Sequence, residues 1–215
     1  MSSWILEATL LILVLLSIVV WSIAVTKVWF QWKEGQKARS FLQGYREVKS
    51  WADAAAFSAN GASDFGAVAC AGFSVCRSLK DEEGAGMAIA DLRESIERAL
   101  RMETYLLVRR REWGMAVMAS VGSVSPFIGL FGTVLGIMNA MKTISATGQA
   151  SIDVVAGPIG EALVTTAVGI ATAVPAVLAY NYFLRQKRLW ISDLDVFSAE
   201  FLRAAIKHRS EWCRL

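Results

Sequence analysis

Apolar residues gather in three long stretches of this sequence, and the charged residues lie almost entirely between them. Asp, Glu, Lys and Arg are absent from residues 8–26, 113–141 and 162–184, which hold 19, 29 and 23 residues. About 20 apolar residues are needed to cross the ~30 Å hydrocarbon core of a bilayer. The pattern therefore predicts three membrane-spanning helices, although the second stretch is rich in Gly and Ser.

Outside these stretches, apolar residues recur at the spacing of an amphipathic helix. Two stripes follow this spacing: Ile89, Leu92, Ile96, Leu100 and Leu107, with Glu103 in series, and Trp190, Leu194, Phe197, Phe201 and Ala204. Each stripe needs a partner, which is either another helix of this chain or a neighbouring subunit. Because no Gly or Pro occurs from Met87 to Trp113, one helix is predicted from about Met87 to Met141.

Basic residues are distributed unevenly around the three spans. Of 22 Lys and Arg, 14 lie in residues 27–112, seven follow residue 184, and Lys142 is the single one between the second and third spans. Cytoplasmic loops carry the excess of basic residues, so the N-terminus and the short loop are predicted to lie outside. The first span is not typical of a cleaved signal peptide, because no basic residue precedes it.

The predicted fold is all-α, a polytopic membrane protein whose three transmembrane helices extend into a cytoplasmic helical bundle. The outer N-terminus is assigned to residues 1–7, the transmembrane helices to 8–30, 113–141 and 157–184, and the outer loop to 142–156. The cytoplasmic parts are a helical domain at 31–112 and a C-terminal helix at 185–215. Turn-forming residues at 60–64 and 80–86 divide the central domain.

Composition excludes several classes of protein. The chain has 215 residues, 55% of them hydrophobic, and a net charge of +3, which argues against a disordered chain and against nucleic-acid binding. Cys70, Cys76 and Cys213 show no zinc-like spacing, and His208 is the single histidine. There is no nucleophile with a base and no phosphate-binding loop, so we predict no enzymatic activity, no metal and no cofactor.

Small residues recur in the second span. Gly129, Gly132 and Gly136 stand three and four residues apart, and small residues let helices approach closely in lipid. Pro126 is expected to bend or loosen this helix. A helix with so few bulky side chains is predicted to pack among other helices or to line a central space.

Two threonines of adjacent spans are predicted to share one depth. Thr133 lies about eight residues from the outer end of the second span and Thr166 about nine from the start of the third, or roughly 12–14 Å inside at ~1.5 Å per residue. Each hydroxyl either bonds back to the carbonyl one turn earlier or contributes to a hydrated polar layer with Thr165 and Asn181.

A carboxylate, Glu161, stands close to the start of the third span. Gly157 and Pro158 are typical of a helix start, where a carboxylate favours the positive end of the helix dipole. Ionisable groups inside membranes also mark ion paths. The residues alone leave both interpretations of Glu161 open.

Three consecutive arginines, Arg109, Arg110 and Arg111, precede the second span. They are interpreted as a topology anchor and as a contact for anionic lipid headgroups. Contact with a protein partner is the weaker alternative.

Two long segments resemble one known family. SPFIGLFGTVLGIMNAM (125–141) and VAGPIGEALVTTAVGIATAVPAVLAYN (155–181) are similar to the ExbB/TolQ family of bacterial energy-coupling proteins, to which the flagellar MotA protein is more distantly related. The resemblance at motif level covers about a quarter of the chain. GPIG and SDLDVFSAEF favour the ExbB group over TolQ.

The resemblance implies a function and a set of partners. Family members form a homopentamer in the cell inner membrane around the single spans of a dimeric partner, ExbD or TolR, which carries an intramembrane Asp. Proton flow past that Asp drives work that reaches TonB or TolA, and ExbB proteins thereby energise iron-siderophore, haem or vitamin B12 uptake. The resemblance matches Thr133 and Thr166 to pore-facing threonines, Glu161 to a functional glutamate, and Pro175 and Asn181 to the family pattern.

The chain departs from that pattern at two positions. Leu135 stands where many members have Trp, and Thr165 stands where Ala is common, which adds a hydroxyl to the layer. A passive membrane scaffold with no ion path is the alternative from another class, and it predicts that apolar substitutions at Thr133 and Thr166 are tolerated.

Overall fold

The computed structural model describes residues 3–48, 50–81, 89–147 and 152–209. Among these residues there are six helices and no strand: α1 Ser3–Glu47, α2 Trp51–Asn60, α3 Asp64–Asp81, α4 Ile89–Arg111, α5 Met115–Thr147 and α6 Ile152–Lys207. Stretches of α1, α5 and α6 are long and apolar enough to cross a membrane. The predictions of an all-α fold and of three spans are confirmed.

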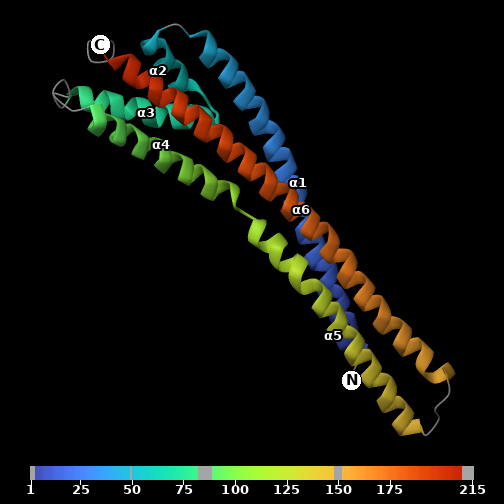
Figure 1. Ribbon diagram of the computed structural model, residues 1–215. Helices are drawn as coiled ribbons and strands as arrows, with labels where there is room; N and C mark the ends of the chain where they lie inside the picture. The colour runs from blue at the N-terminus through green and yellow to red at the C-terminus, as the bar shows by residue number, and fades with distance from the viewer. Residues whose placement is uncertain (1–2, 49, 82–88, 148–151, 210–215) are drawn as a thin grey trace. The chain divides into compact units, whose positions relative to one another are not determined.

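The chain forms two compact units. The first, here named the span unit, comprises Met1–Lys27 and Gly114–Leu184, and the second, the bundle unit, comprises Val28–Trp113 and Arg185–Leu215. Helices α1 and α6 contribute residues to both units, whereas α5 belongs to the span unit and α2, α3 and α4 belong to the bundle unit (Figure 1).

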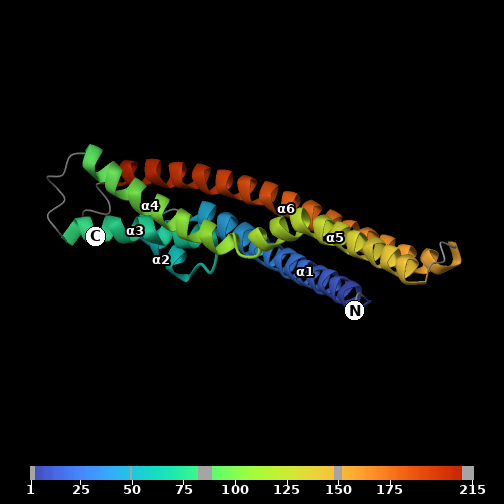
Figure 2. The ribbon, with the colours of Figure 1, turned by 90° about the horizontal axis from the view of Figure 1, so that it is seen from below.

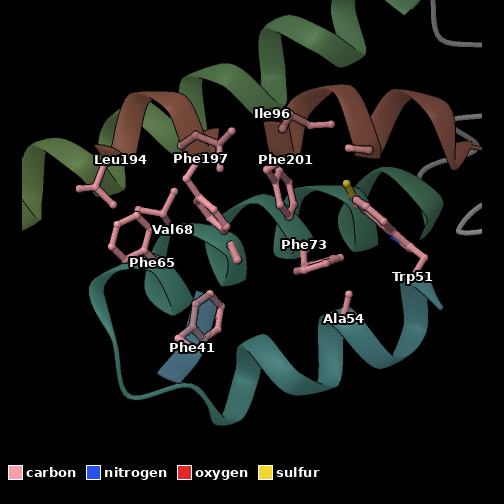
Figure 3. Packing of buried hydrophobic residues seen from close by; sticks show 14 of the residues in the cluster. Phe41, Trp51, Ala54, Phe65, Val68, Phe73, Ile96, Leu194, Phe197 and Phe201 are labelled. Carbon is pink, nitrogen blue, oxygen red and sulfur yellow. The ribbon is translucent and has the colours of Figure 1, made fainter. Parts of the chain in front are cut away.

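Aromatic side chains from several helices form the core of the bundle unit (Figure 3). Phe201 of α6 meets Phe73 of α3 edge-on, with ring centroids 4.9 Å apart. Trp51 of α2 lies 4.7 Å from the same Phe73 ring, and Phe41 of α1 stacks on Phe57 of α2. One continuous core therefore joins α1, α2, α3 and α6.

The two predicted apolar stripes pack into the core of the bundle unit. Seven of their residues belong to the bundle core: Leu92, Ile96, Leu100, Leu107, Leu194, Phe197 and Phe201. Trp190 and Ala204 pack against it partly buried, whereas Ile89 is exposed. The partner of each stripe is thus another helix of the same chain.

The turn between α2 and α3 matches the turn predicted at residues 60–64. Helix α2 ends at Asn60 and α3 begins at Asp64. The Ser63 hydroxyl accepts a hydrogen bond from the Gly66 amide at 3.1 Å, which satisfies one of the unpaired amides at the start of α3. The second predicted turn, at 80–86, falls mainly outside the described residues.

Helix α4 does not continue into α5. It ends at Arg111, and Gly114 adopts a φ of 74°, in the left-handed region that favours glycine. A Cβ atom on Gly114 would lie 2.6 Å from Cγ2 of Ile23. The prediction of one helix through to Met141 is therefore wrong, because the helix-breaking glycine directly follows the Gly-free segment. Met87 lies outside the described residues.

The loop predicted at 142–156 is largely helical. Helix α5 continues to Thr147 and α6 begins at Ile152, five residues before the predicted start at Gly157. Pro158 lies inside α6, where it gives up one main-chain hydrogen bond. Residues 142–147 contain no Gly or Pro, so nothing in that sequence stops α5 at Met141.

Helices α5 and α6 lie side by side in the span unit (Figures 1 and 2). Helix α1 packs on both, since Val20 clusters with Val121 of α5 and Ala176 of α6. Many large apolar side chains of this unit remain exposed, among them Leu11, Trp21, Phe131 and Leu178. Such a surface is typical of contact with lipid or with neighbouring subunits.

Candidate functional site

The closest approach of α5 and α6 is built from glycines. A Cβ atom on Gly129 would lie 2.9 Å from the Thr165 carbonyl oxygen and 3.0 Å from Cα of Thr166. From the other helix, a Cβ atom on Gly169 would lie 2.7 Å from the Ser125 carbonyl oxygen. These obstacles are main-chain atoms, which cannot rotate away, so the glycines permit this separation of the helices.

The close contact continues along α5 toward its C-terminal end. A Cβ atom on Gly132 would lie 2.5 Å from Cγ2 of Thr165, and one on Gly136 would collide with Cβ of Ala162. We name this whole contact the α5–α6 seam, and its residues are Ser125, Gly129, Gly132, Gly136, Ala162, Thr165, Thr166 and Gly169.

The threonine hydroxyls at the seam have different acceptors. Thr166 Oγ1 donates across the seam to the Gly129 carbonyl oxygen at 3.0 Å. Thr165 Oγ1 donates within α6 to the Glu161 carbonyl at 3.2 Å, and Thr133 Oγ1 donates within α5 to the Leu130 carbonyl at 2.7 Å. Back-bonding to the preceding turn thus describes Thr133 and Thr165, whereas Thr166 joins the two helices.

Thr133 and Thr166 come to the same level of the seam. Their chain neighbours, Gly132 and Thr165, are in direct contact. Thr133 and Thr165 are buried and Thr166 is half-buried. Each hydroxyl keeps acceptor capacity while it donates, so this level can still accept a hydrogen bond from a water or from a protonated carboxyl group.

Glu161 lies on the same side of α6 as Thr165, four residues later, but is turned away from Thr166. It is exposed and is the tenth residue of α6, which begins at Ile152. Thr166 is five positions further along the chain, which places the two side chains about 140° apart around the helix. The helix dipole acts mainly within the first turn, so the interpretation of Glu161 as a helix-start residue is wrong.

The two prolines of the predicted packing set lie inside continuous helices. Pro126 is within α5 and Pro175 within α6, so neither breaks its helix. Asn181 is exposed and follows Thr166 by 15 residues, about 22 Å along the helix. The structure therefore separates Asn181 from the threonine hydroxyls.

Two further buried hydroxyls of α5 and α6 were not assigned to the polar layer from the sequence. Ser125 donates to the Val121 carbonyl at 2.7 Å, and Thr172 donates to the Val168 carbonyl at 2.9 Å. Thr172 follows Thr165 by seven residues, which places both on one face of α6. That spacing could have revealed Thr172, whereas the burial of Ser125 depends on the contact with Gly169.

A second polar cluster, the α4 junction, lies at the end of α4 in the bundle unit. Arg111 pairs with Asp64 of α3 at 2.6 Å, and the two side chains are only 16% and 19% exposed. The same guanidinium lies 4.0 Å from the ring centre of Trp190 in α6, a cation–π contact. Glu112 pairs with Lys187 of α6 at 2.9 Å.

The α4 junction corrects the interpretation of the three-arginine run. Arg111 holds α4 to α3 and α6, so its charge is not available to a lipid headgroup. Arg109 and Arg110 are exposed. The run thus combines one structural arginine with two surface arginines.

Comparison with known proteins supplies the family. The model of the MotA/TolQ/ExbB proton channel family matches residues 77–195, a segment that contains α4, α5, the whole seam and α6 as far as Asp195. This chain belongs to that family. Its members are proton channels and energy-coupling subunits.

The relatives that match this chain include proteins named ExbB and a protein named TolQ. The chain is 46% identical over 123 residues to the biopolymer transport protein ExbB of Neisseria gonorrhoeae. The aligned segment covers 57% of this chain and 56% of the relative. It is 47% identical over 105 residues to ExbB of Xanthomonas campestris pv. campestris (strain B100), or 49% of this chain and 42% of the relative.

The second name is that of a related system. Identity is 41% over 116 residues with the Tol-Pal system protein TolQ of Pseudomonas aeruginosa PAO1, which covers 54% of this chain and 49% of that protein. The chain spans about half the length of the curated relatives that it matches.

Proposed function

We propose that this chain is an ExbB-type subunit of a motor in the bacterial inner membrane, driven by the proton motive force. It would energise TonB-dependent uptake of iron-siderophores, haem or vitamin B12 across the outer membrane. The observation that carries this proposal is the α5–α6 seam, which lies wholly inside the matched family segment and holds hydroxyls at one level. Relatives named ExbB at 46% and 47% identity support the ExbB type.

The chemistry proposed for the seam is solvation of a proton or of a partner's carboxyl group. Thr133 and Thr166 would supply acceptor lone pairs at one depth, with Thr165 beside them. Each hydroxyl already donates its own proton to a carbonyl oxygen. These residues can therefore accept a hydrogen bond from a water or a carboxyl group and orient it, while no hydroxyl proton is left without an acceptor inside the membrane. An intramembrane Asp on an ExbD-like span is the proposed group that takes up and releases the proton.

Glu161 supports an assembly of several copies. Glu161 is exposed in a single chain, and its position on α6 is about 140° around the helix from that of Thr166, so its side chain is free to contact a group outside the chain. Copies arranged around a central space would let Glu161 reach a neighbouring subunit or the partner span. We propose a homopentamer around an ExbD-like dimer, with TonB as the receiving partner.

The proposed topology places residues 1–7 in the periplasm and the C-terminus in the cytoplasm. It rests on the excess of Lys and Arg in residues 27–112 and after residue 184. The bundle unit would then be cytoplasmic, and the residues that join α5 to α6 would be periplasmic.

The first experiment identifies the assembly. A tagged full chain is purified from its native membranes, the partners are identified, and the complex is weighed by native mass spectrometry. Five copies with an ExbD-like dimer and TonB are expected. A TolR and TolA set would keep the motor and replace the type with TolQ, to which the TolQ relative at 41% identity points. A monomer under conditions that preserve a known family complex would overturn the assembly.

The second experiment separates a motor from a passive scaffold. Thr166→Val and Glu161→Ala are expected to abolish proton-driven uptake of a ferric siderophore while the complex still assembles. Thr172→Val is the matched control, because the Thr172 hydroxyl bonds within its own helix. Full uptake in a Thr133→Val, Thr166→Val double variant would contradict the role of these hydroxyls and favour the scaffold.

A further inference from the structure

The charges at the end of α4 fall into an internal set and an outward set. The segment Arg109-Arg110-Arg111-Glu112-Trp113 contains four charged residues. Arg111 is paired with Asp64 and Glu112 with Lys187, so the acidic neighbours of the run are already neutralised by partners. Arg109 and Arg110 are exposed, and no ion pair is recorded for either within the described part of the chain.

Two of the other basic residues of α4 are paired locally, and Arg93 directly precedes the acidic Glu94, so residues 89–108 hold three arginines against four acidic residues. Arg98 pairs with Glu94 at 2.7 Å, and Arg101 pairs with Glu97, each one turn away on the same helix. Positive charge in excess of its local partners is therefore concentrated at the C-terminal end of α4. Like all helix C-termini, this end carries the negative pole of the helix dipole, which favours the arginines but does not neutralise them.

An exposed tryptophan stands next to the arginine pair. Trp113 is 64% exposed and is the first residue of the 29-residue uncharged stretch that contains most of α5. An indole ring is favoured at the level of lipid headgroups, where its apolar body and its N–H group are both satisfied. Two exposed guanidinium groups three and four positions before such a ring in the sequence, without a recorded ion pair among the described residues, are suited to a phosphate that lies at the surface of the bilayer.

We infer that Arg109, Arg110 and Trp113 form a binding site for the headgroup of an anionic phospholipid. The site is held in place by Arg111, whose contacts with Asp64 and Trp190 fix the end of α4. The occupant is a lipid of the surrounding membrane, because the site directly precedes a membrane-spanning stretch. This inference requires only that α5 enters a bilayer.

The test measures how tightly the assembled full-length protein holds phosphatidylglycerol. The purified complex is delipidated, titrated with phosphatidylglycerol or phosphatidylcholine, and analysed by native mass spectrometry. The test variant carries Arg109→Gln and Arg110→Gln. The control carries Arg98→Gln and Arg101→Gln, which remove the same charge from the same helix at exposed, locally paired positions.

The expected result is a fall of about 30-fold in apparent affinity for phosphatidylglycerol in the test variant, at roughly fivefold for each basic side chain near a membrane surface. The control should bind almost as the parent does, and phosphatidylcholine binding should be weak in all three. An equal fall in both variants, or none in the test variant, would overturn the site. Loss of subunit assembly with unchanged lipid binding would do so too, since Arg109 and Arg110 would then be subunit contacts. This test measures lipid binding and does not depend on uptake activity. A negative result would therefore contradict the lipid site without contradicting the proposed motor function.

Discussion

The two units of this chain hold their helices together by different means. In the bundle unit, helices meet through aromatic and aliphatic side chains such as Phe201 and Ile96, which are almost completely buried. In the span unit, α5 and α6 meet through Gly129, Gly132 and Gly169, while large apolar side chains point outward. Both units are helical, yet small residues line the α5–α6 contact whereas bulky residues line the core of the bundle unit.

The difference follows from the surroundings of each unit. In water, removal of apolar surface from solvent drives helices together, so large side chains belong inside. In lipid this driving force is absent between helices, and close van der Waals contact with interhelical hydrogen bonds replaces it. The seam and its Thr166–Gly129 bond therefore do for the span unit what the aromatic core does for the bundle unit.

Truncation of a core aromatic should have the largest effect. Phe201→Ala is expected to lower the free energy of unfolding by about 3–5 kcal/mol, because Phe201 is 1% exposed and touches Phe73 and Trp51. The control is Val196→Ala on the same helix, where the side chain is exposed. Thermal unfolding of the full chain in detergent, followed by circular dichroism, compares them, and equal losses would contradict the assigned core.

A single methyl group should have opposite effects at two glycines of the span unit. Gly129→Ala is expected to cost about 1–3 kcal/mol by overpacking against main-chain atoms. Gly160→Ala should instead stabilise by about 0.5–1 kcal/mol, because it lowers chain entropy in the unfolded state and, beyond the adjacent backbone of α6, no atom of the described chain lies within 4 Å of the new Cβ. Unfolding in mixed micelles with SDS measures both. Destabilisation at Gly160 would show that another subunit occupies that space.

Loss of one hydroxyl should distinguish a bond between helices from one within a helix. Thr166→Val removes the bond to Gly129 and is expected to cost about 0.6 kcal/mol, the average for such bonds in membranes. Thr172→Val should cost less, because the Thr172 hydroxyl bonds within its own helix and its loss breaks no bond between helices. The same SDS titration reports both values, and a larger loss at Thr172 would contradict the assignment of the interhelical bond.

At neutral pH the smallest effect on stability concerns a tyrosine of the bundle unit, because its phenol keeps its proton there in the folded and the unfolded chain alike. Burial raises the pKa of Tyr45 from 10.0 to about 12, so the folded state favours the neutral phenol. This contribution to stability is fully present below about pH 10 and is lost as the pH rises toward 12. The difference in ultraviolet titration between the parent chain and Tyr45→Phe should have a midpoint near 12, whereas a midpoint near 10 would show that the ring is solvated.

Much of the fold could be predicted from the sequence because it depends on local quantities. The length of a charge-free stretch decides whether a helix can span a bilayer, and the three spans follow from that length alone. The spacing of Leu194, Phe197 and Phe201 likewise fixes one face of a helix whatever lies opposite. Turn residues such as Asn60 and Gly61 restrict their own backbone, so the α2–α3 turn was also predictable.

The candidate site could be predicted only in part, because its details depend on contacts between distant segments. Thr133 and Thr166 were found from depth, but the acceptor of Thr166 is set by how closely Gly129 lets α5 approach. The sequence does not distinguish the three consecutive arginines from one another. Arg111 is the one held inside because Asp64 and Trp190 lie next to it in the folded chain. The start of α6 was misplaced because Pro158 was assumed to stand in a first turn.

Gly114 has a consequence for how this chain can vary in length. A residue inserted within α1 or α6 would rotate every later side chain of that helix by about 100°, which would turn an apolar face away from its partners. The link between Arg111 and Met115 is short and not helical. A change in its length therefore does not by itself rotate the side chains of α5 relative to those of α4. Insertions and deletions should therefore be tolerated in this link, whereas the same changes within α1 or α6 should prevent correct folding.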